Sequence, residues 1–328
     1  MAEASLQAME DKGKMPWAIV VVNYGSHPLL EANLLPMARH SPEAHVVVVD
    51  SFSTDRERSA VSEQAQRNGW HLVSPHLNVG FGGGMNLGVA RAIELGAERM
   101  LLINPDATME RGDIELLQAE VAASPLTMCA PVIRTSDGSV WFAGADLYLR
   151  DGSIRSERRR EEVDTPYHPW LTGACLMVSR QLWDIVGGFD EDYFLYWEDV
   201  DLSYRVLQAG GRLKCVRTAT AIHDEGATHT EQIAGNRHRA KSPTYYYYNI
   251  RNRLVFARKN LGLKDQRRWQ RGSLKAAYEI LLRGGRRQFL HQPSPAIGSA
   301  LRGLKDGLLP NGSTPYSSGA AAGGWKRR

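Results

Sequence analysis

The sequence has little of what several protein classes require. Its three cysteines lie far apart in 328 residues without a Cys-X-X-Cys pair, so neither a disulfide framework nor a structural zinc site is indicated. No apolar run is long enough to span a bilayer. A formal net charge of +4 is too small for this length to indicate nucleic-acid binding. We therefore expect a cytoplasmic protein, with any membrane contact peripheral and at the inner face of the cell membrane.

Two nucleotide-binding fingerprints and the usual covalent nucleophiles are missing as well. No Walker-type phosphate loop, Ser-His-Asp order or activated cysteine stands in a supporting context. A nicotinamide-binding Rossmann turn would need several glycines after the first strand, whereas the first turn, residues 23–26, has only one. The glycine-rich stretch instead follows Asp50. These absences argue against phosphoryl transfer by a P-loop, covalent catalysis and hydride transfer.

What is present is an alternation of buried-looking strands and amphipathic helices. In the first half, short apolar runs precede helical patterns, and residues 78–86 are predicted to be a glycine-rich loop. This order predicts an α/β fold with a doubly wound, mostly parallel sheet flanked by helices. In the second half we expect a helix over 113–123, a hairpin-like zone over 140–149, a strand over 170–178 and a helix over 199–208.

Carboxylates follow or precede several of these elements. The run ending at Ile103 is followed by Asn104 and Pro105, which would deliver Asp106 to the carboxyl edge of a parallel sheet, where open α/β folds bind ligands. Asp50 ends an earlier strand in the same way. The alternatives are an ordinary turn residue for Asp106 and a helix cap for Asp50.

A second acidic cluster combines Glu198, Asp199 and Asp201 with neighbouring aromatic side chains. Partial desolvation by these aromatics would raise a carboxyl pKa and favour a general base near neutral pH. The alternative is that the carboxylates open a helix and complement its dipole, and both interpretations can hold together.

Residues 245–258 are rich in Tyr, Arg and Asn, and they predict a helix with an apolar stripe that includes Ile250 and Leu254. One interpretation is a helix packed on the catalytic domain with a solvated basic face, and the other is contact with anionic lipid headgroups or a lipid-diphosphate acceptor.

Several motifs occur together and in order: Asn23-Tyr24, Asp50 with Ser53-Thr54-Asp55, residues 78–88, Asn104-Pro105-Asp106, Thr172-Gly173-Ala174, Trp197-Glu198-Asp199, and residues 223–228 beginning at His223. With them the chain resembles the inverting glycosyltransferases of family 2, which have the GT-A nucleotide-sugar-binding fold, and is most similar to the bacterial rhamnosyltransferase-like branch. The sequence departs from the family pattern in having Ser51-Phe52 after Asp50 and Asn104 where the family has an aspartate.

The resemblance implies a domain plan and a role for each motif. It implies a GT-A catalytic domain (15–243) with a nucleotide-sugar half (15–110) and an acceptor half (111–243). From composition and helical pattern we expect a flexible leader (1–14), a helical basic extension (244–308) and a disordered tail (309–328). The implied donor-binding residues are Asn23, Tyr24, Asp50, Asn78, Gly80, Gly82, Gly83, Asn86, Asn104 and Asp106. The implied acceptor-side residues are Thr172, Gly173, Ala174, Trp197 and Glu198, with Asp199 as the catalytic base.

The resemblance also implies a divalent cation, Mn²⁺ or Mg²⁺, held by Asp106 and His223. The expected reaction is transfer of L-rhamnose from dTDP-rhamnose to a bacterial glycan or lipid-linked saccharide. A UDP-hexose or UDP-galactofuranose donor, and a non-catalytic nucleotide- or sugar-binding module, are the alternatives. No nucleic-acid partner is expected.

Overall fold

The computed structural model describes residues 15–157, 166–223, 241–285 and 293–309. Within these ranges the chain divides into two compact units. The first, which we call the catalytic unit, contains the described residues up to 191 and from 198 to 223. The second, the C-terminal unit, contains residues 192–197 and the described residues from 241 onward. The predicted start of the late motif, His223, is described, whereas residues 224–228 lie outside the described ranges, as do the predicted leader and most of the predicted tail.

The catalytic unit is built on a mixed sheet in the order β3-β2-β1-β4-β11-β6-β12-β5, with β7 paired to β6. Its strands are β1 (Trp17–Asn23), β2 (His45–Asp50), β3 (His71–Val73), β4 (Arg99–Ile103), β5 (Ala107–Met109), β6 (Thr127–Arg134), β7 (Val140–Phe142), β11 (Cys175–Ser179) and β12 (Arg212–His223). Its helices are α2 (His27–Leu29), the π-helix η1 (Leu30–Leu34), α3 (Leu35–His40), α4 (Asp55–Asn68), α5 (Gly80–Glu94), α6 (Arg111–Ala123), α7 (Arg180–Val186) and α8 (Glu198–Gln208).

The parallel half of the sheet confirms the predicted α/β fold. β1 pairs in parallel with both β2 and β4, and the middle of β1 is buried on both faces, which explains why its sequence is a continuous apolar run. The register places Asn23 opposite Asp50, so two polar residues meet where their strands end. Beyond β4 the sheet becomes mixed, because β11 is antiparallel to both β4 and β6.

The predicted hairpin over 140–149 is wrong, because its two strands do not pair with each other. β7 pairs with β6, whereas β8 (Ala145–Tyr148) joins β9 (Ser153–Ser156) and β10 (Tyr167–Trp170) in a separate three-stranded antiparallel sheet. The predicted strand over 170–178 is likewise two strands, since β10 ends at Trp170 and β11 begins at Cys175. The intervening turn contains residues 172–174, which the sequence had already singled out.

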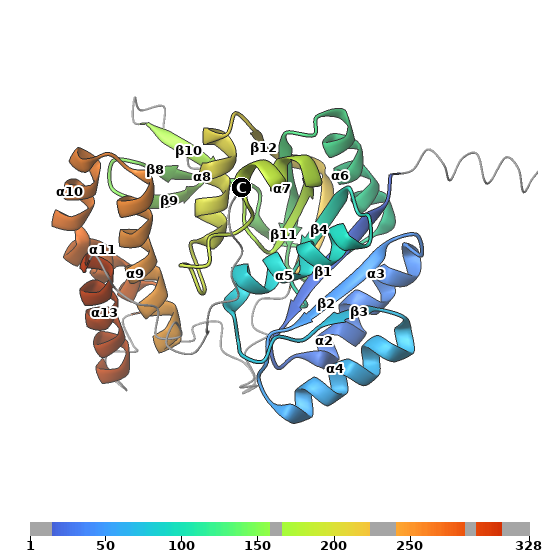
Figure 1. Ribbon diagram of the computed structural model, residues 1–328. Coiled ribbons are helices and arrows are strands. Elements are labelled where there is room, and N and C mark those ends of the chain that lie inside the picture. Colours follow the sequence, from blue (N-terminus) through green and yellow to red (C-terminus); the bar gives the residue numbers. More distant parts are fainter. Residues whose placement is uncertain (1–14, 158–165, 224–240, 286–292, 310–328) are drawn as a thin grey trace, which may run out of the picture. The chain divides into compact units, whose positions relative to one another are not determined.

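The glycine-rich stretch after residue 78 is a helix rather than the predicted loop. Helix α5 begins at Gly80 and packs against β1 and β2 (Figure 1). A Cβ added at Gly84 would lie 2.9 Å from Val22 Cγ2, and one added at Gly82 would lie 2.9 Å from Phe189 Cβ. These glycines therefore allow close packing of a helix on its neighbours, a role that glycine can fill without any bound ligand.

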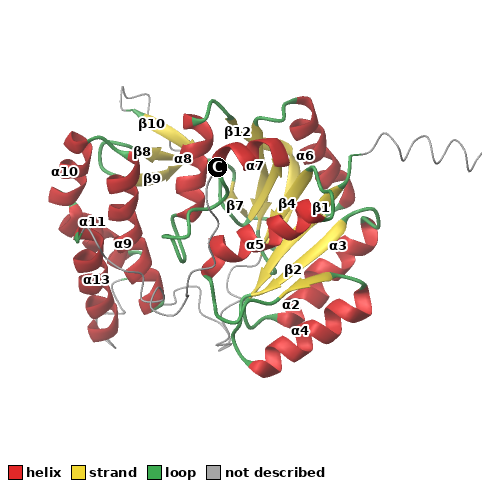
Figure 2. Ribbon diagram, viewed as in Figure 1, coloured by secondary structure: helices red, strands yellow, loops and turns green. Residues whose placement is uncertain are grey.

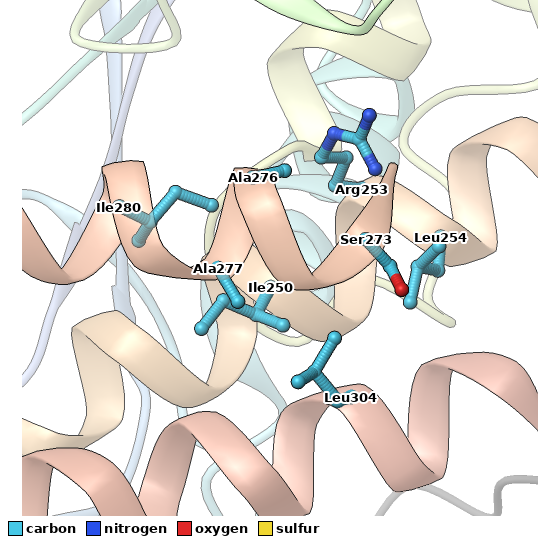
Figure 3. Close-up of a pocket in the computed structure, with 8 residues that line it drawn as sticks. All are labelled: Ile250, Arg253, Leu254, Ser273, Ala276, Ala277, Ile280 and Leu304. Atoms are coloured by element: carbon cyan, nitrogen blue, oxygen red, sulfur yellow. The ribbon is translucent and has the colours of Figure 1, made fainter. Parts of the chain in front are cut away.

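The C-terminal unit is helical, as Figure 2 shows, and confirms the predicted helical extension. It contains α9 (Pro243–Asn260), α10 (Leu263–Arg271), α11 (Ser273–Leu282) and α13 (Pro293–Leu308). Its apolar core includes Ile250 and Leu254 of α9, as the stripe predicted, with Ile280 of α11 and Leu304 of α13. These four side chains converge around a shallow hollow that has no room for a water molecule (Figure 3).

Two of the arginines on α9 do not form the expected solvated basic face. The side chains of Arg251 and Arg253 are buried, with 2% and 4% of their residue surface exposed. The guanidinium of Arg253 lies over the Trp269 ring at 4.6 Å, which a headgroup-binding arginine could not do while remaining accessible. Within the described residues, no helix combines the length and the apolarity that crossing a membrane requires.

The packing of α5 leads to a stability prediction at Gly88. A Cβ there would lie 2.4 Å from Val20 Cγ1 and 3.0 Å from Val49 Cγ2. Gly88→Ala should therefore lower the free energy of unfolding by about 1–3 kcal/mol, measured by urea denaturation, because the helix must move off the sheet. The matched control is Gly112→Ala in α6, where nothing lies within 4 Å, and its unfolding free energy should stay unchanged or rise by up to about 1 kcal/mol. Equal effects of the two substitutions would contradict this packing argument.

Candidate functional site

The first part of the site lies where β1 and β2 end. Asn23 and Asp50 are both completely buried, and the Asn23 amide nitrogen lies 3.4 Å from Asp50 Oδ1 and 3.1 Å from Glu57 Oε1. Arg58 on α4 donates from Nε to the other Asp50 oxygen at 3.0 Å. The carboxylate of Asp50 is thus oriented by charged and polar neighbours, and each of its oxygens retains lone-pair capacity for a further donor.

The sequence interpretation missed three members of this cluster: His27, Glu57 and Arg58. Burial alone would raise the pKa of Glu57, but hydrogen bonds from His27 and Asn23 outweigh it and lower that pKa. Glu57 Oε2 lies 2.6 Å from His27 Nδ1, and Oε1 accepts the backbone N–H of His27 at 2.5 Å. Glu57 and Arg58 could have been found from their place in the first turn of the helix that follows Asp50, whereas no local signal relates His27 to them.

The predicted residues around the start of α5 divide into two kinds of environment. Asn78 Oδ1 accepts hydrogen bonds from Ser51 Oγ at 3.0 Å and from the Gly80 N–H at 2.9 Å, so it ties the turn after β2 to the start of α5. Asn86 instead exchanges two 2.9 Å hydrogen bonds with the backbone of Phe189. Tyr24 is half exposed, at 50% of its residue surface. Asn86 therefore has a structural role, because it ties α5 to the backbone of Phe189. Tyr24 and Asn78 lie instead at the polar edge of the sheet, beside the ends of β1 and β2.

Asp106 and His223 meet although 117 positions separate them. β5 begins directly after Asp106, and its antiparallel pairing with β12 sets Ala107 opposite His223. As a result Asp106 Oδ1 lies 3.0 Å from His223 Nε2, with both side chains about 95% buried. The ring of Trp141 meets the imidazole edge-on at a centroid distance of 4.7 Å. A carboxylate and an imidazole in contact are a donor set that suits Mn²⁺ or Mg²⁺ once phosphate and water oxygens are added.

No group of three or more His, Cys, Asp or Glu that could hold a metal ion occurs among the residues described by the structure. Asp106 and His223 could therefore supply only two ligands, and a cation held there would need further oxygen ligands such as those of a diphosphate or water. Asn104 stands two residues before Asp106 and is partly exposed.

The turn formed by Thr172, Gly173 and Ala174 connects two parts of the site. The Ala174 carbonyl accepts the Asn104 N–H at 3.0 Å, while the Gly173 N–H donates to Asp199 Oδ2 at 2.9 Å. A Cβ at Gly173 would lie 3.1 Å from the Phe81 ring and 3.4 Å from Asp199 Cβ. The turn thus holds the end of β4 and the start of α8 together by hydrogen bonds of its own backbone.

Asp199 has the environment that a general base requires. Its second oxygen, Oδ1, accepts its neighbour Val200's N–H at 2.8 Å, so both oxygens are anchored at the first turn of α8. Burial raises the pKa of Asp199 to about 6, against the opposing effect of these two N–H donors. A carboxylate of that pKa is ionised at neutral pH and is a better proton acceptor than an ordinary aspartate.

Its two acidic neighbours differ from it. Glu198 is buried, and burial together with the adjacent Asp199 charge raises the pKa of Glu198 well above its ordinary value. Asp201 is 1% exposed and accepts a 2.6 Å ion-pair contact from Arg205, which also donates to the Val186 and Gly188 carbonyls. Asp201 therefore holds α8 to the preceding loop through Arg205. Of the three carboxylates, Asp199 is the best placed to accept a proton.

Trp197, predicted on the acceptor side, belongs to the C-terminal unit. Its side chain is 6% exposed and packs with Phe256 and Trp269 at centroid distances of 5.6 and 6.2 Å. Both Trp197 and the preceding Tyr196 have positive φ, 75° and 64°. The motif Trp197-Glu198-Asp199 therefore consists of a tryptophan that packs within the C-terminal unit, followed by the acidic first turn of α8.

The mixed sheet with helices on both sides is the architecture of the GT-A glycosyltransferases. The family model described as "Glycosyl transferase family 2" matches residues 18–186. The chain belongs to this family, in its rhamnosyltransferase-like branch. It is 30% identical over 232 residues to an N-acetylglucosaminyl-diphospho-decaprenol L-rhamnosyltransferase of Mycobacterium tuberculosis, covering 62% of this chain and 75% of that protein.

Two further comparisons agree with this assignment. The chain is 25% identical over 244 residues to the dTDP-rhamnosyl transferase RfbF of Shigella flexneri, covering 74% of this chain and 79% of that protein. It shares the fold of the mannosyltransferase PcManGT of Pyrobaculum calidifontis, solved with GDP-Man and Mn²⁺, with a TM-score of 0.53, 17% identity and coverage of 90% and 88%. The chain is a glycosyltransferase of GT-A fold.

The buried pair at the start of α8 predicts a pH-dependent cost to stability. Because the folded-state pKa of Glu198 is raised, the folded protein holds this proton more tightly than the unfolded chain, and stability falls as the pH rises through the range between the two pKa values. Glu198→Gln should therefore raise the Tm at pH 7.5 by roughly 1–2 °C, the shift that about 1 kcal/mol produces in a protein of this size. This gain should shrink below about pH 4.5, where both states carry the proton.

The control for this measurement is Glu94→Gln. It removes an exposed carboxylate that pairs with Arg91, both residues lying on α5. Its Tm should change little at either pH, because exposed ion pairs contribute about 0–1 kcal/mol. A Glu198→Gln variant that is less stable than the parent at pH 7.5 would show that the buried carboxylate is compensated by favourable contacts.

Proposed function

We propose that this enzyme transfers L-rhamnose from dTDP-rhamnose, with inversion, to a bacterial glycan or a lipid-linked saccharide. The observation that carries the proposal is the turn at residues 172–174, which is hydrogen-bonded on one side to Asn104, two residues before Asp106, and on the other side to Asp199. A donor-binding edge and a general base are thus held by one short turn. The relatives named for rhamnosyl transfer support the choice of sugar.

In this proposal Asp50 binds the base of the nucleotide. An ionised carboxylate accepts the N3 proton of thymine or uracil and discriminates against cytosine, whose N3 has no proton. Arg58 and Asn23 fix the carboxylate from two sides. Since thymine and uracil present the same N3–H, a UDP-hexose or UDP-galactofuranose donor is the alternative, and a module that binds nucleotide or sugar without turnover is the second.

Asp106 and His223 would hold a divalent cation, with Asn104 adjacent. Such a cation, when bound, stabilises the negative charge that develops on the departing diphosphate. Mn²⁺ in the PcManGT structure supports a cation at this type of site, and the imidazole of His223 favours Mn²⁺ over Mg²⁺.

Asp199 accepts the proton of the acceptor hydroxyl as that oxygen attacks the anomeric carbon from the face opposite the diphosphate. The transition state has oxocarbenium character, as in other glycosyl transfers. Thr172, Gly173 and Glu198 lie beside the base and are the proposed acceptor-side residues. In the proposed domain plan, residues 15–110 bind the donor, residues 111–243 bind the acceptor and residues 244–308 form the helical extension; the cytoplasmic location remains a prediction.

A panel of nucleotide sugars tests the donor and the metal together. Purified enzyme should release nucleoside diphosphate from dTDP-rhamnose with Mn²⁺ or Mg²⁺, and excess chelator should abolish that release. Asp106→Ala should lower turnover at least about 10²-fold, because it removes the carboxylate that faces the diphosphate charge, and should also weaken Mn²⁺ binding measured by electron paramagnetic resonance. Asp184→Asn, which alters only an exposed pair with Arg180, is the control. Full turnover in excess chelator would overturn the metal role. Binding of a nucleotide sugar without release of nucleoside diphosphate from any donor would favour the non-catalytic binding module.

The base assignment is tested by Asp199→Asn, which is nearly isosteric but cannot accept a proton at neutral pH. Its kcat should fall by about two to four orders of magnitude while the donor KM stays close to that of the parent. In the parent enzyme kcat should rise as the pH increases through about 6, where Asp199 ionises. Asp201→Asn is the matched comparison, and it should lower stability by about 1–3 kcal/mol through loss of the Arg205 pair rather than abolish turnover. The reverse pattern would assign the base to Asp201.

A further inference from the structure

The six residues that precede the catalytic helix adopt a constrained turn inside the C-terminal unit. Residues 192–197 belong to that unit, and the next residue, Glu198, opens α8. Tyr196 and Trp197 are the two non-glycine residues with positive φ in the described chain, and they are consecutive. L side chains rarely adopt this conformation, so it persists only where surrounding contacts impose it.

Two side chains of α9 supply such contacts to the backbone of this turn. The Asn252 amide nitrogen donates to the Leu195 carbonyl at 2.9 Å and to the Tyr196 carbonyl at 2.7 Å. Arg251 Nη1 donates to the Asp192 carbonyl at 3.0 Å and to Asn252 Oδ1 at 2.6 Å. Asn252 is completely buried and Arg251 is 2% exposed. These hydrogen bonds hold the turn at its first residue and again directly before its last.

Aromatic packing within the same unit fixes the side chains of the turn. Phe194 stacks on Tyr248 at a centroid distance of 5.4 Å, and Tyr196 meets Tyr245 edge-on at 5.3 Å. The Trp197 ring packs with Phe256. A conformation that is intrinsically unfavourable is therefore held by backbone hydrogen bonds and by ring contacts together.

We infer that Asn252, supported by Arg251, is a positioning residue for the catalytic base. The carbonyls that Asn252 holds lie two and three residues before Glu198 and three and four residues before Asp199, so these hydrogen bonds fix the backbone that leads directly into the helix carrying the base. The inference rests on the proposed function, in which Asp199 is the base. A base must lie within hydrogen-bond reach of the acceptor hydroxyl, and a displacement of about 1 Å can cost about 10²-fold in rate.

The test compares Asn252→Ala with Asn249→Ala. Both asparagines lie buried on α9, but the Asn249 amide donates to the Tyr245 carbonyl of its own helix rather than to the turn. Asn252→Ala should lower kcat about 10–100-fold with the donor KM changed less than twofold, because the donor site is left intact. Asn249→Ala should keep both parameters within twofold of the parent. An unchanged kcat in Asn252→Ala, or an equal loss in both variants, would overturn the inference.

Amide hydrogen exchange followed by mass spectrometry gives a second readout that needs no activity. In Asn252→Ala, peptides covering residues 192–201 should exchange faster while peptides from β1, β2 and β4 keep their protection, and Asn249→Ala should show neither change. Unaltered exchange over 192–201 in Asn252→Ala would refute the positioning role even if the enzyme used another donor. Should Asn252→Ala not fold, Asn252→Asp preserves the side-chain volume and the Arg251 partner while removing the N–H donors, and it should give the same pattern. Failure of every donor with the parent enzyme would refute the proposed function alone.

Discussion

The hydrogen bonds of one short turn hold together the parts of this site that carry different chemistry. The backbone of residues 173 and 174 bonds to Asp199 on one side and to Asn104 on the other, so the start of α8 and the end of β4 share a single rigid connection. The bond to Asn104 joins two backbone groups, and the bond to Asp199 is donated by the Gly173 N–H to the carboxylate itself. A Cβ at position 173 would lie 3.1 Å from the Phe81 ring, so a larger residue there would require that ring to shift.

The same compact arrangement places carboxylates where water is scarce. Burial raises the pKa of Glu198 and Asp199, and the two adjacent charges oppose one another. The N–H groups of Gly173 and Val200 offset this for Asp199, which keeps its pKa near 6 and leaves it ionised at neutral pH. The charge of the third carboxylate, Asp201, is instead compensated by its ion pair with Arg205. Three acidic residues within four positions thus have three different electrostatic environments.

Close helix packing on glycine recurs in both units. In the catalytic unit, α5 approaches β1 at Gly84 and Gly88. In the C-terminal unit, a Cβ at Gly303 of α13 would lie 2.6 Å from the Tyr247 carbonyl oxygen of α9. The glycine-rich motif of the sequence therefore serves the packing of the fold, which needs no bound ligand.

The sequence by itself determined the parallel half of the sheet and the helix at Asp199, because apolar runs and helical periodicity are local signals. It also brought forward Asp50 and Asp106, since each follows or ends an apolar run, whereas Asn23 and residues 172–174 came from the resemblance to the family. Tertiary structure alone decided the antiparallel insertion of β11, the helical state of the glycine-rich stretch and the burial of Arg251 and Arg253. These features depend on which distant element supplies a partner: a glycine run is compatible with a loop or a tightly packed helix, and an arginine is buried only when carbonyls and an aromatic ring receive it. The contact between Asp106 and His223 has the same origin, because the pairing of β5 with β12 joins residues that no local pattern relates.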